Sequence, residues 1–127
     1  MALPSMGAKR RVVIIDDEPA FAETLTKIVK SLGFEVTVST DPRSSYTFAL
    51  ENTDVVFVDV LMPNVSGLQV LEKLAQQKTR SSIVLMSGHL ERLDEAEKLA
   101  RKLDLNLVGA LEKPFRIEDV KDVLLGA

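Results

Sequence analysis

Three carboxylates, a hydroxyl and an ammonium group each follow a short apolar run of this sequence. They are Asp16 and Asp17 after residues 12–15, Asp59 at the end of 54–59, Ser87 after 82–86 and Lys113 after 107–111. Carboxylates that meet at one place repel one another unless a cation joins them. Because the ligands are oxygens and the chain has no cysteine, the cation that suits such a site is Mg²⁺, which binds one or two carboxylates and keeps several waters.

A group of side chains of this kind can accept a phosphoryl group. Once a metal ion and Lys113 neutralise part of the negative charge, a carboxylate can attack phosphorus, and both cations stabilise charge on the transferred oxygens. Ser87 would donate a hydrogen bond to one of these oxygens. Each residue alone has a plainer interpretation as a turn former, helix cap or surface group. The combination, in this order at successive strand ends, is what indicates chemistry.

The apolar runs predict a parallel sheet. Residues 12–15, 54–59, 82–86 and 107–111 are nearly all apolar, as in strands buried on both faces, and 35–39 alternates like a half-exposed strand. Amphipathic helices are expected from Pro19 to a stop at Gly33, over 41–50, after a turn at 63–67, over 90–103 and over 117–125. This alternation predicts an α/β fold with right-handed crossovers, helices on both faces and a site where the strands end.

The composition is that of one globular domain. The chain has 127 residues, 46% of them hydrophobic, and a formal net charge of −3, which gives no reason to expect direct binding to nucleic acid or to a membrane surface. The absence of cysteine excludes disulfides and is compatible with the cytoplasm, and no apolar run approaches the roughly 20 residues of a membrane span. We expect residues 1–8 to be a disordered leader or a cloning remnant and residues 9–127 to form the domain.

Four motifs together resemble the receiver domain of two-component response regulators. They are Asp16-Asp17, Asp59 with Met62-Pro63 and Gly67, Ser87-Gly88, and Lys113-Pro114-Phe115. The resemblance covers residues 11–125 and implies a flavodoxin-like, doubly wound, five-stranded parallel sheet of order 2-1-3-4-5 with five helices. It also implies a role for each residue: Asp59 as phosphoacceptor, Asp16, Asp17, Asp59 and the backbone carbonyl of Leu61 as Mg²⁺ ligands, Ser87 as the switch hydroxyl, and Lys113, before a cis proline, as partner of the phosphoryl group.

The resemblance implies a phosphorylation-dependent signalling switch rather than an independent enzyme. A histidine kinase or phosphotransfer protein would donate the phosphoryl group, and the added charge would bias helix 90–103, strand 107–111 and helix 117–125 between two packings. Output would come from that face, through a homodimer or contact with an output domain. We expect a stand-alone regulator or, in view of the short leader and abrupt end, a domain excised from a longer protein. The long helix followed by residues 109–114 also resembles receivers joined to cyclic-di-GMP phosphodiesterases.

Three features depart from the common receiver pattern. Ala110 stands where the family usually has an aromatic or histidine side chain, and Tyr46 is not on the fifth strand and cannot replace it. Leu61 and His89 occupy the two positions that flank access to the phosphoryl group; His89 could guide a water, although an exposed loop imidazole is its plainer interpretation. The interval from the switch hydroxyl to the lysine, 113 − 87 = 26 residues, is longer than usual and fits an extra turn in helix 90–103.

Three other functions deserve comparison. A phosphatase with an aspartyl-phosphate intermediate would place a second carboxylate two residues after the nucleophile, where this chain has Leu61. A nucleotide-binding domain would need a glycine-rich phosphate loop after a strand, and none is present. A degenerate receiver that serves as a constitutive interaction or dimerisation module is the alternative that Ala110 supports. The complete set of acids and Lys113 favour the active switch.

Overall fold

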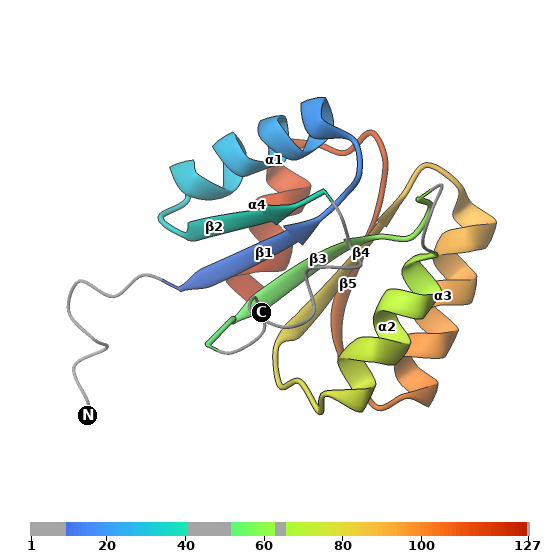
Figure 1. The fold of residues 1–127 in the computed structure, drawn as a ribbon. Helices are drawn as coiled ribbons and strands as arrows, with labels where there is room; N and C mark the ends of the chain where they lie inside the picture. Colours follow the sequence, from blue (N-terminus) through green and yellow to red (C-terminus); the bar gives the residue numbers. More distant parts are fainter. Residues whose placement is uncertain (1–9, 41–51, 63–65, 127) are drawn as a thin grey trace.

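The computed structural model describes residues 10–40, 52–62 and 66–126, and a parallel five-stranded sheet forms its centre (Figure 1). The strands are β1 (Arg11–Ile15), β2 (Glu35–Ser39), β3 (Val55–Asp59), β4 (Ser82–Ser87) and β5 (Asn106–Glu112). They lie in the order β2-β1-β3-β4-β5. β3 and β4 are buried along their whole length, as expected for inner strands of a sheet that is covered on both faces. Because all pairs are parallel, the carboxyl ends of the strands share one edge.

Among the described residues, two helices pack on each face of the sheet (Figure 1). α1 (Pro19–Ser31) and α4 (Ile117–Gly126) cover one face, and α2 (Gly67–Gln76) and α3 (Leu90–Lys102) cover the other. Side chains of the strands alternate between these layers: Ile14 and Phe57 belong to the apolar cluster beneath α1 and α4, whereas Val56 and Leu85 belong to the cluster beneath α2 and α3. The sheet therefore separates two apolar cores.

Local sequence signals fix where the helices begin and end. Pro19 occupies the first turn of α1, where its missing N–H costs nothing, and Gly33 follows the helix with a φ of 96°, a conformation that favours glycine. α2 begins with a capping box, in which the Leu68 N–H donates to the Ser66 hydroxyl at 3.1 Å and the Ser66 N–H donates to Gln69 Oε1 at 3.2 Å. These contacts fix the residue at which α2 begins.

β5 contains an irregularity that the sequence pattern did not reveal. Ile83 of β4 pairs with Leu107, but the next residue, Val84, pairs with Gly109, so Val108 is an extra residue in β5. A Cβ atom on Gly109 would lie 2.9 Å from a methyl carbon of Val123 in α4. α4 can therefore approach the bulged strand closely because residue 109 has no side chain.

The structure confirms the predicted fold class and strand order. The five strands and the helices over 19–31, 67–76, 90–102 and 117–126 lie where the sequence predicts them, with strand ends that differ by at most one residue. The helix predicted over 41–50, the start of the turn at 63–65 and the leader 1–8 lie outside the described residues, so four of the five predicted helices are described. Within the described ranges, no helix is long and apolar enough to cross a membrane.

Candidate functional site

Four strands deliver chemically active side chains to the same edge of the sheet. These are Asp16 just after β1, Asp59 at the end of β3, Ser87 at the end of β4 and Lys113 just after β5. The parallel register aligns the ends, since Asp59 lies opposite Met86 and Ser87 lies opposite Glu112. Residues far apart in the chain therefore meet at the edge that the sequence predicts.

The acids form a compact cluster. Asp16, Asp17 and Asp59 each offer a carboxylate oxygen, and these three oxygens lie within 4.8 Å of one another. Asp16 is fully buried and Asp59 is 2% exposed, while Asp17 is half-buried. Hard oxygen donors at this spacing fit a Mg²⁺ ion, which takes few carboxylates and completes its shell with water. The role of the Leu61 carbonyl as a further ligand stays a prediction.

Lys113 reaches into this cluster from the loop after β5. Its Nζ lies 3.0 Å from Asp16 Oδ2 and 3.3 Å from Asp59 Oδ2, and the side chain is 13% exposed. The Lys113 backbone N–H donates to the carbonyl of Ser87 at 2.8 Å, and the peptide to Pro114 is cis, as predicted. One cation therefore lies between two buried carboxylates, which lowers the cost of burying their charges.

Burial and the neighbouring charge of Asp16 raise the pKa of Asp59 from 3.8 to about 7. Lys113 and the hydrogen bond from the Leu61 N–H to Asp59 Oδ1, at 3.2 Å, oppose this rise and only partly offset it. Asp59 is therefore an acid whose charge is costly in the metal-free protein, and a divalent cation in the cluster would favour its ionised form.

Burial and neighbouring charges also shift the pKa values of Asp17 and Lys113. Burial raises the pKa of Asp17 above its usual value, and the charge of Asp16 adds to this effect. For Lys113, burial would lower the pKa, but its hydrogen bond to Asp16 and the charges of Asp16 and Asp59 outweigh burial and raise the pKa above 10.5. Lys113 therefore stays protonated and supplies a permanent positive charge beside Asp59.

Ser87 is fully buried at the end of β4. Its Oγ accepts a hydrogen bond from the His89 N–H at 3.0 Å, which fixes the position of the oxygen. A serine hydroxyl has one hydrogen to donate in addition to its acceptor positions. The hydroxyl can therefore still donate to an oxygen that arrives at this edge.

Gly67 holds α2 against the end of β3. A Cβ atom at this position would lie 2.5 Å from Val60 Cα and 2.8 Å from the carbonyl oxygen of Asp59, and the Gly67 N–H donates to the Val60 carbonyl at 3.0 Å. Real Cβ atoms do not approach backbone atoms so closely. Because residue 67 has no side chain, the start of α2 can lie directly against the backbone of Asp59 and Val60.

Residues 12–125 match the family model of the response regulator receiver domain. The chain belongs to this family. The resemblance that the motifs suggest is thus confirmed, and the matched residues include all the site residues named above.

The receiver is similar in sequence to transcriptional regulatory proteins. It is 32% identical over 115 residues to the probable transcriptional regulatory protein TcrX of Mycobacterium tuberculosis, with 90% of this chain and 47% of the relative covered. It is 30% identical over 112 residues to the transcriptional regulatory protein FixJ of Bradyrhizobium diazoefficiens, with 87% and 52% covered. The receiver spans about half the length of these curated relatives.

Solved structures share the fold. A response regulator from Colwellia psychrerythraea superposes with a TM-score of 0.83 at 32% identity, covering 93% of this chain and 95% of that one. The response regulator TrrA of Thermotoga maritima, solved in complex with Mg²⁺ and BeF, superposes with a TM-score of 0.76 at 24% identity, covering 91% and 96%. At the lower identity the likeness concerns the fold.

Leu61 and His89 lie beside the site, since their backbone N–H groups donate to Asp59 Oδ1 and Ser87 Oγ. Both line a hollow of about 560 Å³, and Leu61 is 47% exposed. His89 is exposed in the loop before α3, in accord with its plainer interpretation. Ala110 instead packs, partly buried, on the core beneath α2 and α3, so the position expected to carry an aromatic ring holds one methyl group.

Two residues near Lys113 were missed by sequence reasoning. Glu18 Oε1 lies 3.3 Å from Lys113 Nζ, and the ring centroid of Phe21 lies 3.9 Å from the same atom. Glu18 could have been suspected, because it directly follows the acidic pair. Phe21 could not, because its spacing marks it as a core residue of an amphipathic helix.

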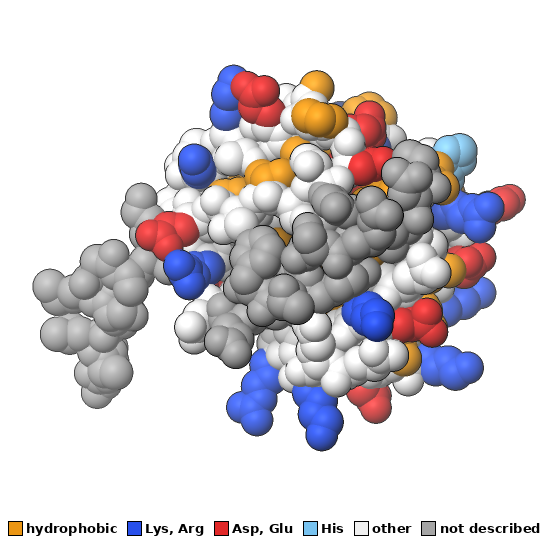
Figure 2. All heavy atoms as spheres, in the orientation of Figure 1, with side chains coloured by type: hydrophobic (Ala, Val, Ile, Leu, Met, Phe, Trp, Pro, Cys, Tyr) orange, Lys and Arg blue, Asp and Glu red, His pale blue; other side chains and the backbone are white. Residues whose placement is uncertain are grey.

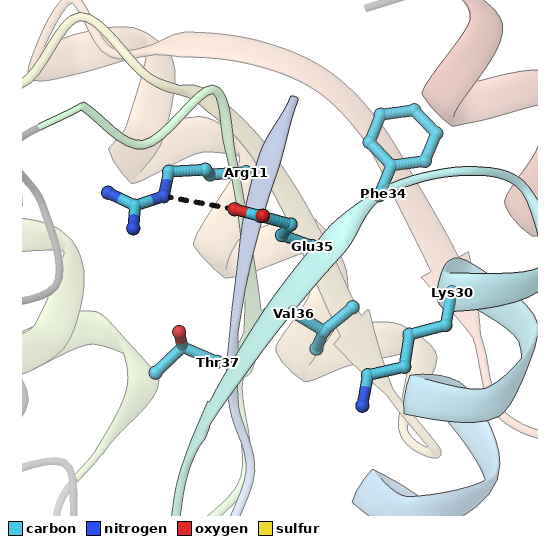
Figure 3. Close-up of a pocket in the computed structure, with 6 residues that line it drawn as sticks. All are labelled: Arg11, Lys30, Phe34, Glu35, Val36 and Thr37. Carbon is cyan, nitrogen blue, oxygen red and sulfur yellow. Dashed lines mark ion pairs between the residues drawn. The ribbon is translucent and has the colours of Figure 1, made fainter. Parts of the chain in front are cut away.

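Features away from this edge do not join the site. A second hollow, of about 510 Å³, lies at the opposite ends of β1 and β2, where Arg11 and Glu35 form an exposed ion pair (Figure 3). On the face drawn in Figure 2, basic and acidic side chains intermingle where α3 lies, as its Asp94–Lys98 ion pair illustrates. Both ion pairs are exposed, so we assign them little energy.

Proposed function

We propose that this receiver is a phosphorylation-dependent switch in which Asp59 accepts a phosphoryl group from a histidine kinase or phosphotransfer protein. The observation that supports this most directly is the cluster of three carboxylates within 4.8 Å, with Lys113 Nζ 3.3 Å from Asp59 Oδ2. Family membership adds the expectation of a two-component partner. Asp59 is the natural acceptor because it ends the central buried strand, at the edge of the sheet where Lys113 and the other acids meet it.

In the proposed reaction a carboxylate oxygen of Asp59 attacks phosphorus. The new O–P bond forms as the bond from phosphorus to the donor's histidine nitrogen breaks, and the electron pair leaves with the imidazole. The product on this chain is a mixed anhydride of carboxylate and phosphate. Phosphoryl transfer of this kind depends on positioning and charge stabilisation more than on further covalent steps.

The chain's own residues divide the remaining tasks. Asp16, Asp17, Asp59 and the Leu61 carbonyl would hold Mg²⁺, whose chemical contribution is to neutralise the acids and the phosphoryl oxygens. Lys113, held beside Asp59, pairs with the phosphoryl group after transfer. Ser87 donates its hydroxyl hydrogen to a phosphoryl oxygen from the neighbouring strand end.

Output is proposed to come from the face formed by α3, β5 and α4. New charge at Asp59 draws Ser87 and Lys113, which lie at the ends of β4 and β5, and so biases the packing of the adjoining helices. Dimerisation, or contact with an output domain, would read that change. The names of the relatives point to transcriptional regulation, and a cyclic-di-GMP phosphodiesterase is the output partner that the long α3 suggests.

We propose that the receiver is not an independent enzyme beyond its own phosphorylation and dephosphorylation. A phosphatase that uses Asp59 as nucleophile would need a general acid, and Leu61 offers none at the expected position. The second candidate function is a degenerate receiver that binds partners constitutively, which Ala110 favours because one methyl group cannot couple Ser87 to an aromatic rotation. The full set of acids around Lys113 supports the active switch.

One incubation separates these functions. The receiver is treated with acetyl phosphate, with and without Mg²⁺, and its intact mass and oligomeric state are followed beside those of Asp59→Asn. We expect the wild type to gain one phosphoryl group only with Mg²⁺, and the variant to gain none. An unchanged wild type, identical to Asp59→Asn, would establish the constitutive module instead. Turnover of unrelated phosphate esters would establish a phosphatase.

A further inference from the structure

Phe21 contacts the ammonium group of Lys113 with the face of its ring. The ring centroid lies 3.9 Å from Lys113 Nζ, well inside the distance at which a cation and an aromatic face attract. Phe21 is in the first turn of α1, just after the acidic pair at the end of β1. The ring therefore lies at the site but belongs to neither the metal ligands nor the acceptor.

Phe115 packs against the same ring. The two ring centroids are 5.4 Å apart with an interplanar angle of 88°, an edge-to-face arrangement that aromatic pairs favour. Phe115 and Lys113 come from one loop, so the Phe21 ring contacts this loop through two side chains. The position of the ring is thereby fixed relative to Lys113.

The hydrogen bonds of Lys113 explain why the ring matters. An ammonium group has three donors, and Asp16, Asp59 and Glu18 accept from Nζ at 3.0, 3.3 and 3.3 Å. A metal ion in the cluster would share the oxygens of Asp16 and Asp59. Glu18 is 65% exposed, and its ion pair is screened by water. Among these four contacts of Lys113 Nζ, the contact with the Phe21 ring is the one that neither a metal nor solvent weakens.

We propose that Phe21 is a positioning residue, whose ring keeps the Lys113 ammonium group beside Asp59 while the carboxylates bind the metal. The proposal rests on the proposed function, because it concerns how Lys113 reaches the phosphoryl group at Asp59. Phe21 touches neither the reacting oxygen nor phosphorus and acts through Lys113. Its loss slows phosphoryl transfer and leaves metal binding intact.

The test compares Phe21→Leu, Phe21→Tyr and Phe34→Leu with the wild type. Phe34 is the matched control because it belongs to the same apolar cluster and its ring faces the Arg10 guanidinium at 5.6 Å, but it lines the hollow at the opposite end of β2 (Figure 3). The maximal rate of phosphorylation, the acetyl phosphate concentration at half that rate, and Mg²⁺ affinity by calorimetry are measured for each.

We expect Phe21→Leu to lower the maximal rate about three- to tenfold, the range that a partly desolvated cation–π contact implies. The half-saturating concentration and the Mg²⁺ affinity should stay within about twofold of wild type, because uniform binding is unchanged. Phe21→Tyr keeps an aromatic face and should restore the rate, and Phe34→Leu should match the wild type. Equal rates for Phe21→Leu and Phe34→Leu would overturn the proposal.

A spectroscopic readout on the wild type does not depend on how the variants fold. In proton NMR, the side-chain methylene next to Nζ of Lys113 should resonate upfield of the other lysines, because the Nζ to which it is bonded lies 3.9 Å from the centroid of the Phe21 ring, and it should stay upfield in saturating Mg²⁺. Loss of that displacement with Mg²⁺ would overturn the proposal. A wild type that no donor phosphorylates would overturn the proposed function as well, whereas a phosphorylated wild type with an unaffected Phe21→Leu would overturn this inference alone.

Discussion

Asp59 is a nearly buried carboxyl whose charge the metal-free protein opposes. Near neutral pH it is divided between its two protonation states, because burial and Asp16 raise its pKa to about 7. A cation bound in the cluster offsets the charge of Asp16 and favours the carboxylate. Metal binding and proton release from Asp59 would therefore be linked, and the carboxylate form that the proposed reaction requires is the form that a metal would stabilise.

This linkage predicts how Asp59→Asn changes stability with pH. The folded-state pKa of Asp59 lies above the ordinary value of 3.8, so its contribution to stability is fully present below that value and is lost as the pH rises through about 7. Asn carries no charge at any pH. With a chelator present, we expect the variant to gain about 1–2 kcal/mol relative to wild type between about pH 4 and about pH 8, after allowance for solvent screening.

Urea unfolding at several pH values measures this difference, and Asp104→Asn is the control. Asp104 lies on the turn between α3 and β5, away from the cluster, and its substitution measures the effect of removing a carboxylate elsewhere in the chain. A variant Asp59→Asn that loses stability relative to wild type as the pH rises would contradict the account.

The same linkage predicts a pH-dependent affinity for Mg²⁺. If Asp59 is a ligand, as we propose, it must lose its proton to bind the ion, so affinity should rise about tenfold between about pH 6 and about pH 8. The raised pKa of Asp17 acts in the same direction. Calorimetric titration should show the rise in the wild type and a much smaller one in Asp59→Asn. An affinity that does not change with pH in the wild type would mean that Asp59 is already ionised without metal.

At the scale of residues, the charged side chains of the site could be predicted from sequence, but the contact between Phe21 and Lys113 could not. Asp16, Asp17, Asp59 and Lys113 stand out because a charged side chain at the end of a buried strand needs a reason. Phe21 does not stand out, because a phenylalanine at helical spacing is expected to pack into the core. Phe21 does so, and in addition its ring contacts Lys113. Which face of that ring meets which cation depends on tertiary packing.

The junction of β3 and α2 determines where Asp59 points. The capping box of α2 fixes where the helix begins, and the Gly67 N–H, which donates to the Val60 carbonyl, holds that helix start against the residue after Asp59. In Gly67→Ala, the new Cβ would lie 2.5 Å from Val60 Cα, and backbone cannot yield as a flexible side chain can. We expect a loss of about 1–3 kcal/mol in stability and slower Mg²⁺-dependent phosphorylation, because Asp59 is displaced.

Gly126→Ala is the matched control for this substitution. Gly126 ends α4, and a Cβ atom there would meet nothing within 4 Å. Urea unfolding and phosphorylation by acetyl phosphate should both remain close to wild type in the control. Equal effects of the two alanine substitutions would show that the tight contact at Gly67 does not position Asp59.

At the scale of elements, the sequence predicted the strands and the described helices closely. The apolar runs fix the inner strands, and Pro19 and Gly33 mark the ends of the first helix. The bulge in β5 was not predictable, because Val108 and Gly109 continue the apolar run without a break. Val123 of α4 packs directly over Gly109, a tertiary contact that the sequence pattern does not show.

At the scale of the whole molecule, a parallel sheet gathers distant residues at one edge. The alternation of strands and helices predicted this arrangement, because parallel connections bring every strand back in the same direction. The predicted order 2-1-3-4-5 came from the receiver resemblance and is confirmed. The identity of the output partner does not follow from this alternation, which specifies the core of the fold and not the surface that a partner would contact.

The most direct test of the account is to locate the phosphoryl group. The receiver is phosphorylated with acetyl phosphate and Mg²⁺, reduced with borohydride, which converts an aspartyl phosphate to homoserine, and digested for peptide mass analysis. The account predicts homoserine at position 59 and none in a sample prepared without Mg²⁺. Conversion of another aspartate instead of Asp59, or a phosphorylated protein with no homoserine, would contradict it.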